Sequence, residues 1–211
     1  MNNQDVSKEE LIIKAAMDVF IEKGRSGARM QDIANRAGVN KALLHYYFRN
    51  KETLYEKIFE TIFVRYFSQI NILLEADVPF EESLRTFIYM YIDILRDNPK
   101  FVSFMCRELS EGGAVLNKQI SNITKAIESI PPVKLIKLLE NAQKDGNIIK
   151  GNVRQLMITI IGACVYYFLA EPLIKILIVK DSYDTSRFIE ERKQSIFETI
   201  YYGIKPRGDN Q

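Results

Sequence analysis

The sequence predicts an all-α protein made of two parts. Apolar residues recur at the spacing of one helix face, and no run alternates as a half-buried strand would. Glycine and proline divide the chain into segments of helix length. At 211 residues the chain is long enough for a small helical unit joined to a larger helical body.

The first helix is predicted to follow Ser7 and to end at Gly24. Ser7 and Glu10 have the spacing of a capping box, in which each side chain bonds the backbone N–H of the other residue. Gly24 is a residue that tolerates the left-handed conformation found at helix ends. The apolar face of this helix consists of Leu11, Ile12, Ala15, Ala16, Val19 and Phe20.

Two short helices and a longer one are expected next. Residues 30–37 form the second helix, which Gly38 ends, and residues 41–47 form the third, which Asn40 caps. A fourth helix begins near Lys51 and joins this region to the rest of the chain. The small unit therefore comprises residues 1–50, with its three helices within residues 1–48.

The remaining residues, 51–211, form a larger helical domain. Its helices are separated mainly by proline and glycine, as at Pro79, Pro99 and Gly146. The predicted ranges beyond residue 75 are 80–97, 99–110, 114–129, 132–145, 152–178 and 185–203.

Composition excludes several kinds of site. One His and two Cys rule out zinc sites built on His pairs and a disulfide scaffold, and no glycine-rich phosphate-binding motif is present. We expect no catalytic residues, no metal and no cofactor, so the protein is not expected to be an enzyme. Cys106 and Cys164 are interpreted as buried small apolar side chains. The polar N-terminus indicates no export signal and a cytoplasmic location.

Positive charge is concentrated in one short segment. The net charge of the chain is only +2, yet residues 23–51 hold seven Lys or Arg side chains against a single acidic residue, Asp32. A charged run of this kind is either a solvated helix face or an electrostatic footprint for nucleic acid.

Residues 30–48 have the pattern of a helix-turn-helix. Ala34 and Ala37 are small enough for two helices to cross closely, Gly38 reverses the chain, and Val39 and Leu44 fill the crossing. In this motif the second helix presents its outer face to the major groove of double-stranded DNA.

The run Ile33-Ala34-x-x-Ala37-Gly38-Val39-x-x-x-x-Leu44-x-x-Tyr47-Phe48-x-x-Lys51-Glu52-x-Leu54 resembles the signature of TetR/AcrR-type transcriptional regulators. Ala16-x-x-x-Phe20-x-x-x-Gly24 is similar to the first helix of that family. The likeness covers about residues 8–55. It implies a DNA-binding domain at residues 1–50 and a helical domain at residues 51–211 that binds a small effector and dimerises.

The residues expected to contact DNA lie in and beside the third helix. Arg29 stands where the family usually has Thr or Ser, and it adds a positive charge. Leu43 lacks a hydrogen-bonding group, so a base contact there would be an apolar one with a thymine methyl. The full set is Arg29, Asn40, Lys41, Ala42, Leu43, His45, Tyr46, Tyr47 and Lys51.

Two of these residues have alternative interpretations. A lone histidine such as His45 is more often a structural residue, but its position on the outer face of the motif favours a DNA contact. Tyr46 could be a core residue, or both Tyr46 and Tyr47 could lie at the DNA surface. Phe48 is expected in the core.

The longest apolar run spans residues 156–170. It is shorter than the roughly 20 residues of a membrane span, and Glu171 and Pro172 end it. A helix that is apolar all round has to bury two faces, so one could meet the domain core and the other a second subunit. The family resemblance implies a homodimer formed by the last two long helices, with Ile160, Tyr167, Phe188, Phe197, Ile200 and Tyr201 at the interface.

Most aromatic residues lie beyond residue 50. They either pack as a core or line a cavity, and the family resemblance implies a small-molecule site among them. Tyr91, Asp93, Arg107 and Glu108 are possible polar anchors. The residues expected to line an effector pocket are Tyr66, Phe67, Phe87, Met90, Tyr91, Phe101, Phe104 and Met105.

Three functions fit the sequence to different degrees. The favoured one is a homodimeric DNA-binding regulator, a repressor that an apolar or aromatic effector releases from a near-palindromic operator, with no membrane partner. The second is an enzyme with a helical active site, for which no convergent titratable residues are found. The third is a dimeric ligand-binding protein without operator binding, against which the intact basic segment argues.

Overall fold

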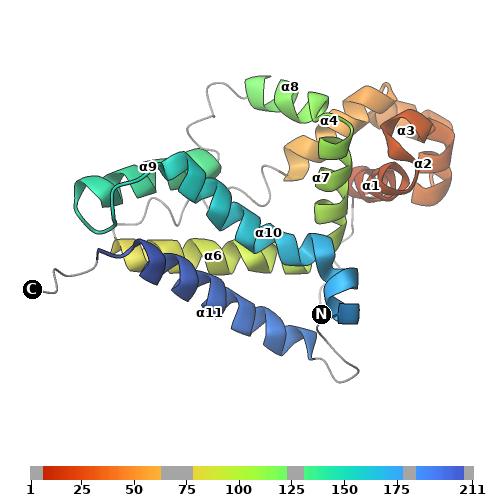
Figure 1. Cartoon of the computed structure of the whole chain (residues 1–211). Coiled ribbons are helices and arrows are strands. Elements are labelled where there is room, and N and C mark those ends of the chain that lie inside the picture. The colour runs from red at the N-terminus through yellow and green to blue at the C-terminus, as the bar shows by residue number, and fades with distance from the viewer. Residues whose placement is uncertain (1–6, 63–77, 123–130, 178–183, 207–211) are drawn as a thin grey trace, which may run out of the picture. The chain divides into compact units, whose positions relative to one another are not determined.

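The computed structural model describes residues 7–62, 78–122, 131–177 and 184–206, and every regular element of these residues is a helix (Figure 1). The predicted all-α fold is therefore confirmed. The helices are α1 (Lys8–Gly27), α2 (Met30–Ala37), α3 (Lys41–Tyr47), α4 (Lys51–Ile62), α6 (Phe80–Asp97), α7 (Pro99–Ser110), α8 (Ala114–Asn122), α9 (Pro131–Lys144), α10 (Val153–Leu177) and α11 (Thr185–Ile204).

Most predicted helix boundaries agree with the structure to within a residue or two. The predicted helix 114–129 is observed as α8 up to Asn122, and residues 123–130 lie outside the described residues. Gly24 interrupts the first helix, as predicted, although a further helical turn follows it. Gly24 has φ 71° and ψ 169°, which kinks α1, and the helix resumes as far as Gly27.

The chain forms two compact units. The N-terminal unit comprises residues 1–65 and 100–124, and the C-terminal unit comprises residues 66–99 and 125–211. The N-terminal unit thus contains α7 and α8 beside α1 to α4, whereas the sequence suggested a boundary at residues 50 and 51. α6, α9, α10 and α11 belong to the C-terminal unit.

An aromatic cluster forms the centre of the N-terminal unit. The Tyr55 ring of α4 lies 4.7 Å from the ring of Phe20 on α1 and 5.0 Å from that of Phe104 on α7, measured between centroids. Phe59 and Phe104 are also 5.0 Å apart. All four rings are buried. Aromatic pairs at this separation add about 1 kcal/mol each beyond the area that they bury.

The carboxylate of Glu108 is buried beside this cluster. One oxygen accepts a hydrogen bond of 2.9 Å from the Tyr55 hydroxyl, and the other accepts bonds from the backbone N–H groups of Val115 at 2.8 Å and Leu116 at 3.2 Å. Burial and this hydrogen bond raise the pKa of Tyr55. Glu108 therefore ties α4, α7 and the first turn of α8 together in a place where an unpaired carboxylate would be costly.

Arg107 joins the end of α7 to the kink of α1. Its guanidinium donates a 2.9 Å hydrogen bond to the carbonyl of Ile21, three residues before the kink. A Cβ atom at Gly24 would lie 2.6 Å from Nη2 of Arg107. The positive φ favours glycine at this position, and a Cβ atom would also displace the Arg107 guanidinium.

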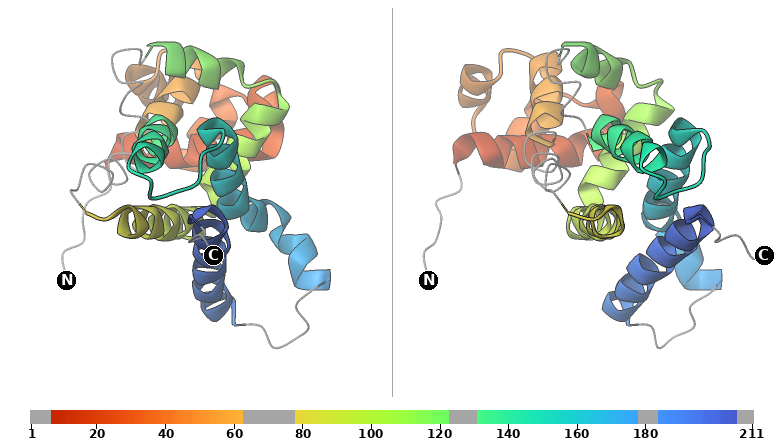
Figure 2. Two further views of the ribbon diagram at one scale, coloured as in Figure 1. Left: turned by 60° about the vertical axis from the view of Figure 1, so that its left-hand side comes forward. Right: turned by 90° about the vertical axis from the view of Figure 1, so that its left-hand side faces the viewer.

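The C-terminal unit is a separate bundle in which α6, α10 and α11 pack against one another and α9 packs on α10 (Figure 2). The buried side chain of Lys193 on α11 makes two ionic contacts. Its Nζ lies 2.6 Å from the carboxylate of Asp93 on α6, which links the two helices, and 2.7 Å from that of Glu190 on α11 itself. Lys193 is 4% exposed, so its charge has to be paired.

We expect loss of the buried carboxylate to destabilise the N-terminal unit. Glu108→Ala leaves three donors without their acceptor and should lower the free energy of unfolding by about 3 kcal/mol, whereas Tyr55→Phe should cost about 1 kcal/mol. Chemical denaturation measures both values. Glu111→Ala is the control, because Glu111 is exposed and its ion pair with Arg107 is worth about 0.5 kcal/mol or less. Equal losses for Glu108→Ala and Glu111→Ala would contradict this role.

Candidate nucleic-acid interface

The turn between α2 and α3 is built around Gly38. This residue has φ 66° and ψ 31°, and its N–H donates to the carbonyl of Asn35 while the N–H of Val39 donates to that of Ala34. These two bonds define a Schellman motif, which closes a helix and turns the chain. Ala34 and Leu44 are fully buried at the crossing, as the helix-turn-helix interpretation predicts.

Asn40 sets the first turn of α3. Its side-chain oxygen accepts a 2.7 Å hydrogen bond from the N–H of Leu43, which is the expected capping contact. Arg29 precedes α2 in the same place but makes no capping hydrogen bond, and its side chain is exposed. The guanidinium of Arg29 is therefore available to a partner outside the chain.

The outer face of α3 is fully displayed. Lys41, Ala42, His45, Tyr46 and Tyr47 are all exposed, and Leu44 points into the core. Tyr46 is 82% exposed, which excludes the alternative that placed it in the core; its contact with DNA stays a prediction. Leu43 is only half-buried, and Phe48 is buried as expected.

Local contacts orient His45 and the two tyrosines on this face. Nδ1 of His45 lies 3.2 Å from the carbonyl oxygen of Arg49, so Nδ1 carries the proton and donates to it. This contact orients the ring and leaves Nε2, the acceptor of a ring protonated on Nδ1, available to a donor on a base edge. The rings of Tyr46 and Tyr47 meet edge to face with centroids 5.4 Å apart, which restricts the rotation of both.

Much of the positive charge of residues 23–51 is neutralised within the N-terminal unit. Lys23 pairs with Asp32 at 2.7 Å, and Arg36 pairs with Glu22 on α1. Hydrogen bonds from these cations lower the pKa values of both carboxyl groups. These pairs hold α2 against α1 and leave Arg29, Lys41 and Arg49 as exposed cations beside the outer face of α3. Arg49 was not among the predicted contacts, although it lies in the same basic segment.

Lys51 has a structural partner. Its ammonium donates to the carbonyls of Ala28 at 3.2 Å and Ser26 at 3.4 Å, so it links the start of α4 to the loop before α2. A contact between Lys51 and phosphate stays a prediction. An ammonium has three donors, and two of them are used here.

The residues predicted for an effector pocket are divided between the two units. Phe101, Phe104 and Met105 lie on α7, and Phe87, Met90 and Tyr91 lie on α6. Phe104 packs in the aromatic cluster of the N-terminal unit, and the rings of Phe87 and Tyr91 stack with centroids 5.8 Å apart in the C-terminal unit. Tyr66 and Phe67 lie outside the described residues.

The possible polar anchors are largely used within the fold. Arg107 and Glu108 bind α1, α4 and α8, and Asp93 pairs with Arg96 and Lys193. Tyr91 is deep enough for burial to raise its pKa. These contacts favour positioning roles for the three charged anchors.

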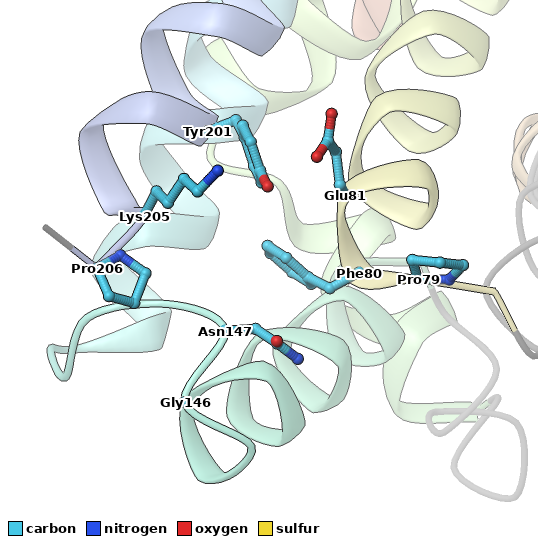
Figure 3. Close-up of a pocket in the computed structure, with 8 residues that line it drawn as sticks. All are labelled: Pro79, Phe80, Glu81, Gly146, Asn147, Tyr201, Lys205 and Pro206. Atoms are coloured by element: carbon cyan, nitrogen blue, oxygen red, sulfur yellow. The ribbon is translucent and has the colours of Figure 1, made fainter. Parts of the chain in front are cut away.

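A pocket of about 400 Å³ opens at one end of the C-terminal unit (Figure 3). It lies between the first turn of α6, the loop after α9 and the end of α11. Tyr201 and Glu81 face each other across it, and their hydrogen bond lowers the pKa of the Glu81 carboxyl. None of the six predicted effector-pocket residues that the structure describes lines it; its lining consists of Pro79, Phe80, Glu81, Gly146, Asn147, Tyr201, Lys205 and Pro206.

The residues predicted at a dimer interface face the core of the C-terminal unit. Ile160, Tyr167, Phe197, Ile200 and Tyr201 are buried in the single chain, and Phe188 is half-buried. The opposite face of α10 is apolar and exposed. It carries Ile158, Tyr166, Leu169, Leu173, Ile176 and Leu177.

The comparisons with known proteins agree with this geometry. A family model described as "Bacterial regulatory proteins, tetR family" matches residues 12–58, and one described as "Tetracyclin repressor-like, C-terminal domain" matches residues 81–200. The HTH-type transcriptional regulator RutR of Escherichia coli (strain K12) is 25% identical over 201 residues, which is 95% of this chain and 92% of RutR.

Solved structures share the fold over nearly the whole chain. A putative fatty acid metabolism regulator of Clostridium perfringens has a TM-score of 0.76 at 20% identity, covering 93% of this chain and 100% of that one. The regulator FadR of Bacillus subtilis, solved in complex with stearoyl-CoA, has a TM-score of 0.70 at 22% identity, covering 92% and 98%.

Two exposed cations provide a test of the interface. Lys41→Ala and Arg49→Ala should each weaken DNA binding across sequences, because each removes one phosphate contact per chain. For a dimer, each should reduce the log–log salt slope of binding by about 2. Fluorescence anisotropy at several salt concentrations measures this slope. Lys150→Ala removes an exposed cation of the C-terminal unit and should leave the slope unchanged. A slope that responds equally to all three variants would refute the assignment.

Proposed function

The chain belongs to the tetR family of bacterial regulatory proteins, and from this premise we propose that it is a homodimeric repressor that a small apolar effector releases from DNA. The protein is a DNA-binding transcriptional regulator, and its helix-turn-helix is the part that reaches DNA. The observation that carries the proposal is the outer face of α3, where Lys41, Ala42, His45, Tyr46 and Tyr47 are exposed and Arg49 follows as a further exposed cation. Such a regulator acts in the cytoplasm, where the chromosome lies.

The exposed face of α10 supports the dimer. Ile158, Tyr166, Leu169, Leu173 and Ile176 follow one another at intervals of three, four or eight residues, so they form one continuous stripe. Contiguous apolar surface of this kind marks an interaction site. The exposed face of α11 beside it is polar except for Tyr202, which suits the rim of an interface.

A membrane is the other apolar environment that such a helix can occupy. Among the described helices, α10 alone is long and apolar enough to cross a membrane, and 17% of its most apolar window is buried in the single chain. Its buried face, however, packs on α6, α9 and α11. A helix already packed along one side needs a partner for the other side only, which a second copy of the chain supplies.

A dimer presents two copies of α3 to DNA. In dimeric helix-turn-helix proteins the two recognition helices enter major grooves about one helical turn apart, so the operator is near-palindromic. An effector that binds the DNA-free arrangement more tightly than the DNA-bound one shifts the population away from DNA. A bound repressor of this kind leaves its operator when the effector concentration rises.

The aromatic side chains of α6 and α7 suggest an apolar or aromatic effector. Because the B. subtilis FadR structure contains stearoyl-CoA, long-chain acyl-CoA is a rational first probe, with free fatty acids and planar aromatic compounds beside it. A true effector should raise the melting temperature of the free protein and weaken its binding to DNA. A compound that stabilises the protein without affecting DNA binding is a ligand but not an effector.

Selection from a randomised duplex pool tests DNA recognition directly. Protein that has been unfolded and refolded to remove bound ligand should enrich a near-palindromic sequence at about 150 mM salt. With about 8 phosphate contacts, the log–log salt slope should be about −7. If a folded dimer enriches no sequence, the alternative function holds: a dimeric small-molecule-binding protein without operator binding.

Charge placed on the α10 stripe should prevent dimerisation. Leu169→Glu with Leu173→Glu puts two carboxylates where the partner would bury them, and light scattering should then report a monomer. Leu109→Glu is the matched control, since Leu109 is an exposed leucine of the N-terminal unit at 59% exposure. It should leave the dimer intact. A dimer that survives the double change, or a wild-type monomer that binds lipid vesicles, would rule out this interface.

A further inference from the structure

The outer face of α3 has only one side chain of the kind that identifies bases by paired hydrogen bonds. Arg or Lys recognises guanine and Asn or Gln recognises adenine through two bonds each, and Glu or Asp accepts from cytosine. Of these residue types, residues 41–47, KALLHYY, contain Lys41 alone. Asn40 precedes them, but its side-chain oxygen is already bonded to the N–H of Leu43 at 2.7 Å. This bond uses one of the two lone pairs of the oxygen and fixes the side chain in the orientation of a cap.

The same face instead offers a continuous apolar surface. Ala42 and Tyr46 are four residues apart, so they lie one turn apart on the same side of the helix. Both are exposed, and Tyr46 is 82% exposed. The edge-to-face contact with Tyr47 restricts the Tyr46 ring. An apolar surface with little freedom to rearrange is suited to the one apolar group in the major groove, the C5-methyl of thymine.

Leu43 is less suited to this contact than the sequence suggested. It is half-buried against the helix-turn-helix, and its neighbour Leu44 is fully buried. The side chains that a base edge can reach are those of Ala42 and Tyr46, together with Lys41 and His45 on the adjoining strip. Lys41 ends in a flexible point charge, and His45 offers one ring nitrogen because the other is bonded to Arg49.

We propose that Ala42 and Tyr46 read thymine methyl groups, so that each operator half-site contains at least one thymine recognised by apolar contact rather than by paired hydrogen bonds. This inference rests on the proposed function, since it concerns how the regulator identifies its operator. Lys41 contacts the phosphate backbone or a base, His45 accepts from a donor on a neighbouring base, and the two apolar side chains select thymine.

Replacing thymine by uracil tests the methyl contact alone. Uracil pairs with adenine as thymine does but lacks the C5-methyl, so hydrogen bonding in both grooves is unchanged. Duplexes that carry the sequence enriched by selection are made with each thymine replaced in turn by deoxyuridine. At the thymines read by α3, wild-type protein should lose about fourfold in affinity for each methyl removed, and about sixteenfold when both half-sites are changed.

Variants of Tyr46 test whether its ring causes the loss of affinity for uracil. In Tyr46→Ala the penalty for uracil should fall below twofold at the thymine that this ring contacts, while overall affinity also falls. Tyr46→Phe keeps the ring and removes the hydroxyl, so it should keep the full uracil penalty. Thermal denaturation of the free variants checks folding, which is expected to be unchanged because the ring lies outside the core.

The other outcomes contradict either the thymine contact alone or the proposed function as well. If uracil changes affinity by less than twofold at every position of an enriched site, thymine is not read through its methyl, although the regulator function stands. If Tyr46→Phe and Tyr46→Ala weaken binding equally and leave the uracil penalty intact, the Tyr46 hydroxyl contacts phosphate and the assignment is wrong. If no duplex is enriched, the proposed function and this inference fail together.

Discussion

The arrangement of the DNA-binding surface depends on a buried carboxylate that lies outside the helix-turn-helix. α2 and α3 have eight and seven residues, too few for either to be stable alone. They are held by α1 and α4, which in turn pack on α7 through Phe20, Tyr55 and Phe104. Glu108 fixes this packing at one geometry, because its oxygens accept only from donors in the right places on α4 and α8. A small recognition element therefore relies on helices encoded fifty to eighty residues later.

Charge in the N-terminal unit serves two separate purposes. Lys23 and Arg36 are paired with carboxylates and Lys51 is bonded to carbonyls, so these cations position helices. Arg29, Lys41 and Arg49 are exposed beside α3. The high density of Lys and Arg in residues 23–51 thus overstates the charge offered to phosphate. This division also explains why a regulator can have a net charge of only +2: binding requires a few well-placed cations rather than a strongly basic protein.

Features that depend on neighbouring residues could be predicted from the sequence, and features that depend on distant ones could not. The capping box of Ser7 and Glu10, the Asn40 cap and the left-handed Gly38 are all local, and each was predicted. Arg107 also bonds Ile21 and Glu108 also bonds Tyr55, which lie 86 and 53 residues away along the chain, so no spacing rule reveals these contacts. Gly24 shows the difference: its positive φ was predictable, but its role as the place where Arg107 approaches α1 was not.

The apolar helix α10 was predictable as an element but not in its orientation. Its apolar residues continue around the helix, so the sequence cannot say which of them face the chain's own core. The structure buries Ile160, Cys164 and Tyr167 and leaves Tyr166 and Leu169 exposed. The residues expected at the interface therefore belong to the core of the C-terminal unit, and the opposite stripe takes their place in the proposed dimer.

The exposed stripe of α10 and the exposed face of α3 both need a partner that covers their apolar side chains. Each displays large apolar side chains that a single chain leaves in water, as Ile176 at 78% and Tyr46 at 82% exposure illustrate. In the proposed dimer, the partner chain covers the first surface, and DNA covers the second when the dimer binds it. Because dimerisation makes the second half-site contact intramolecular, it raises the effective concentration of the second α3. A modest apolar readout by each helix is then sufficient for selective binding by the pair.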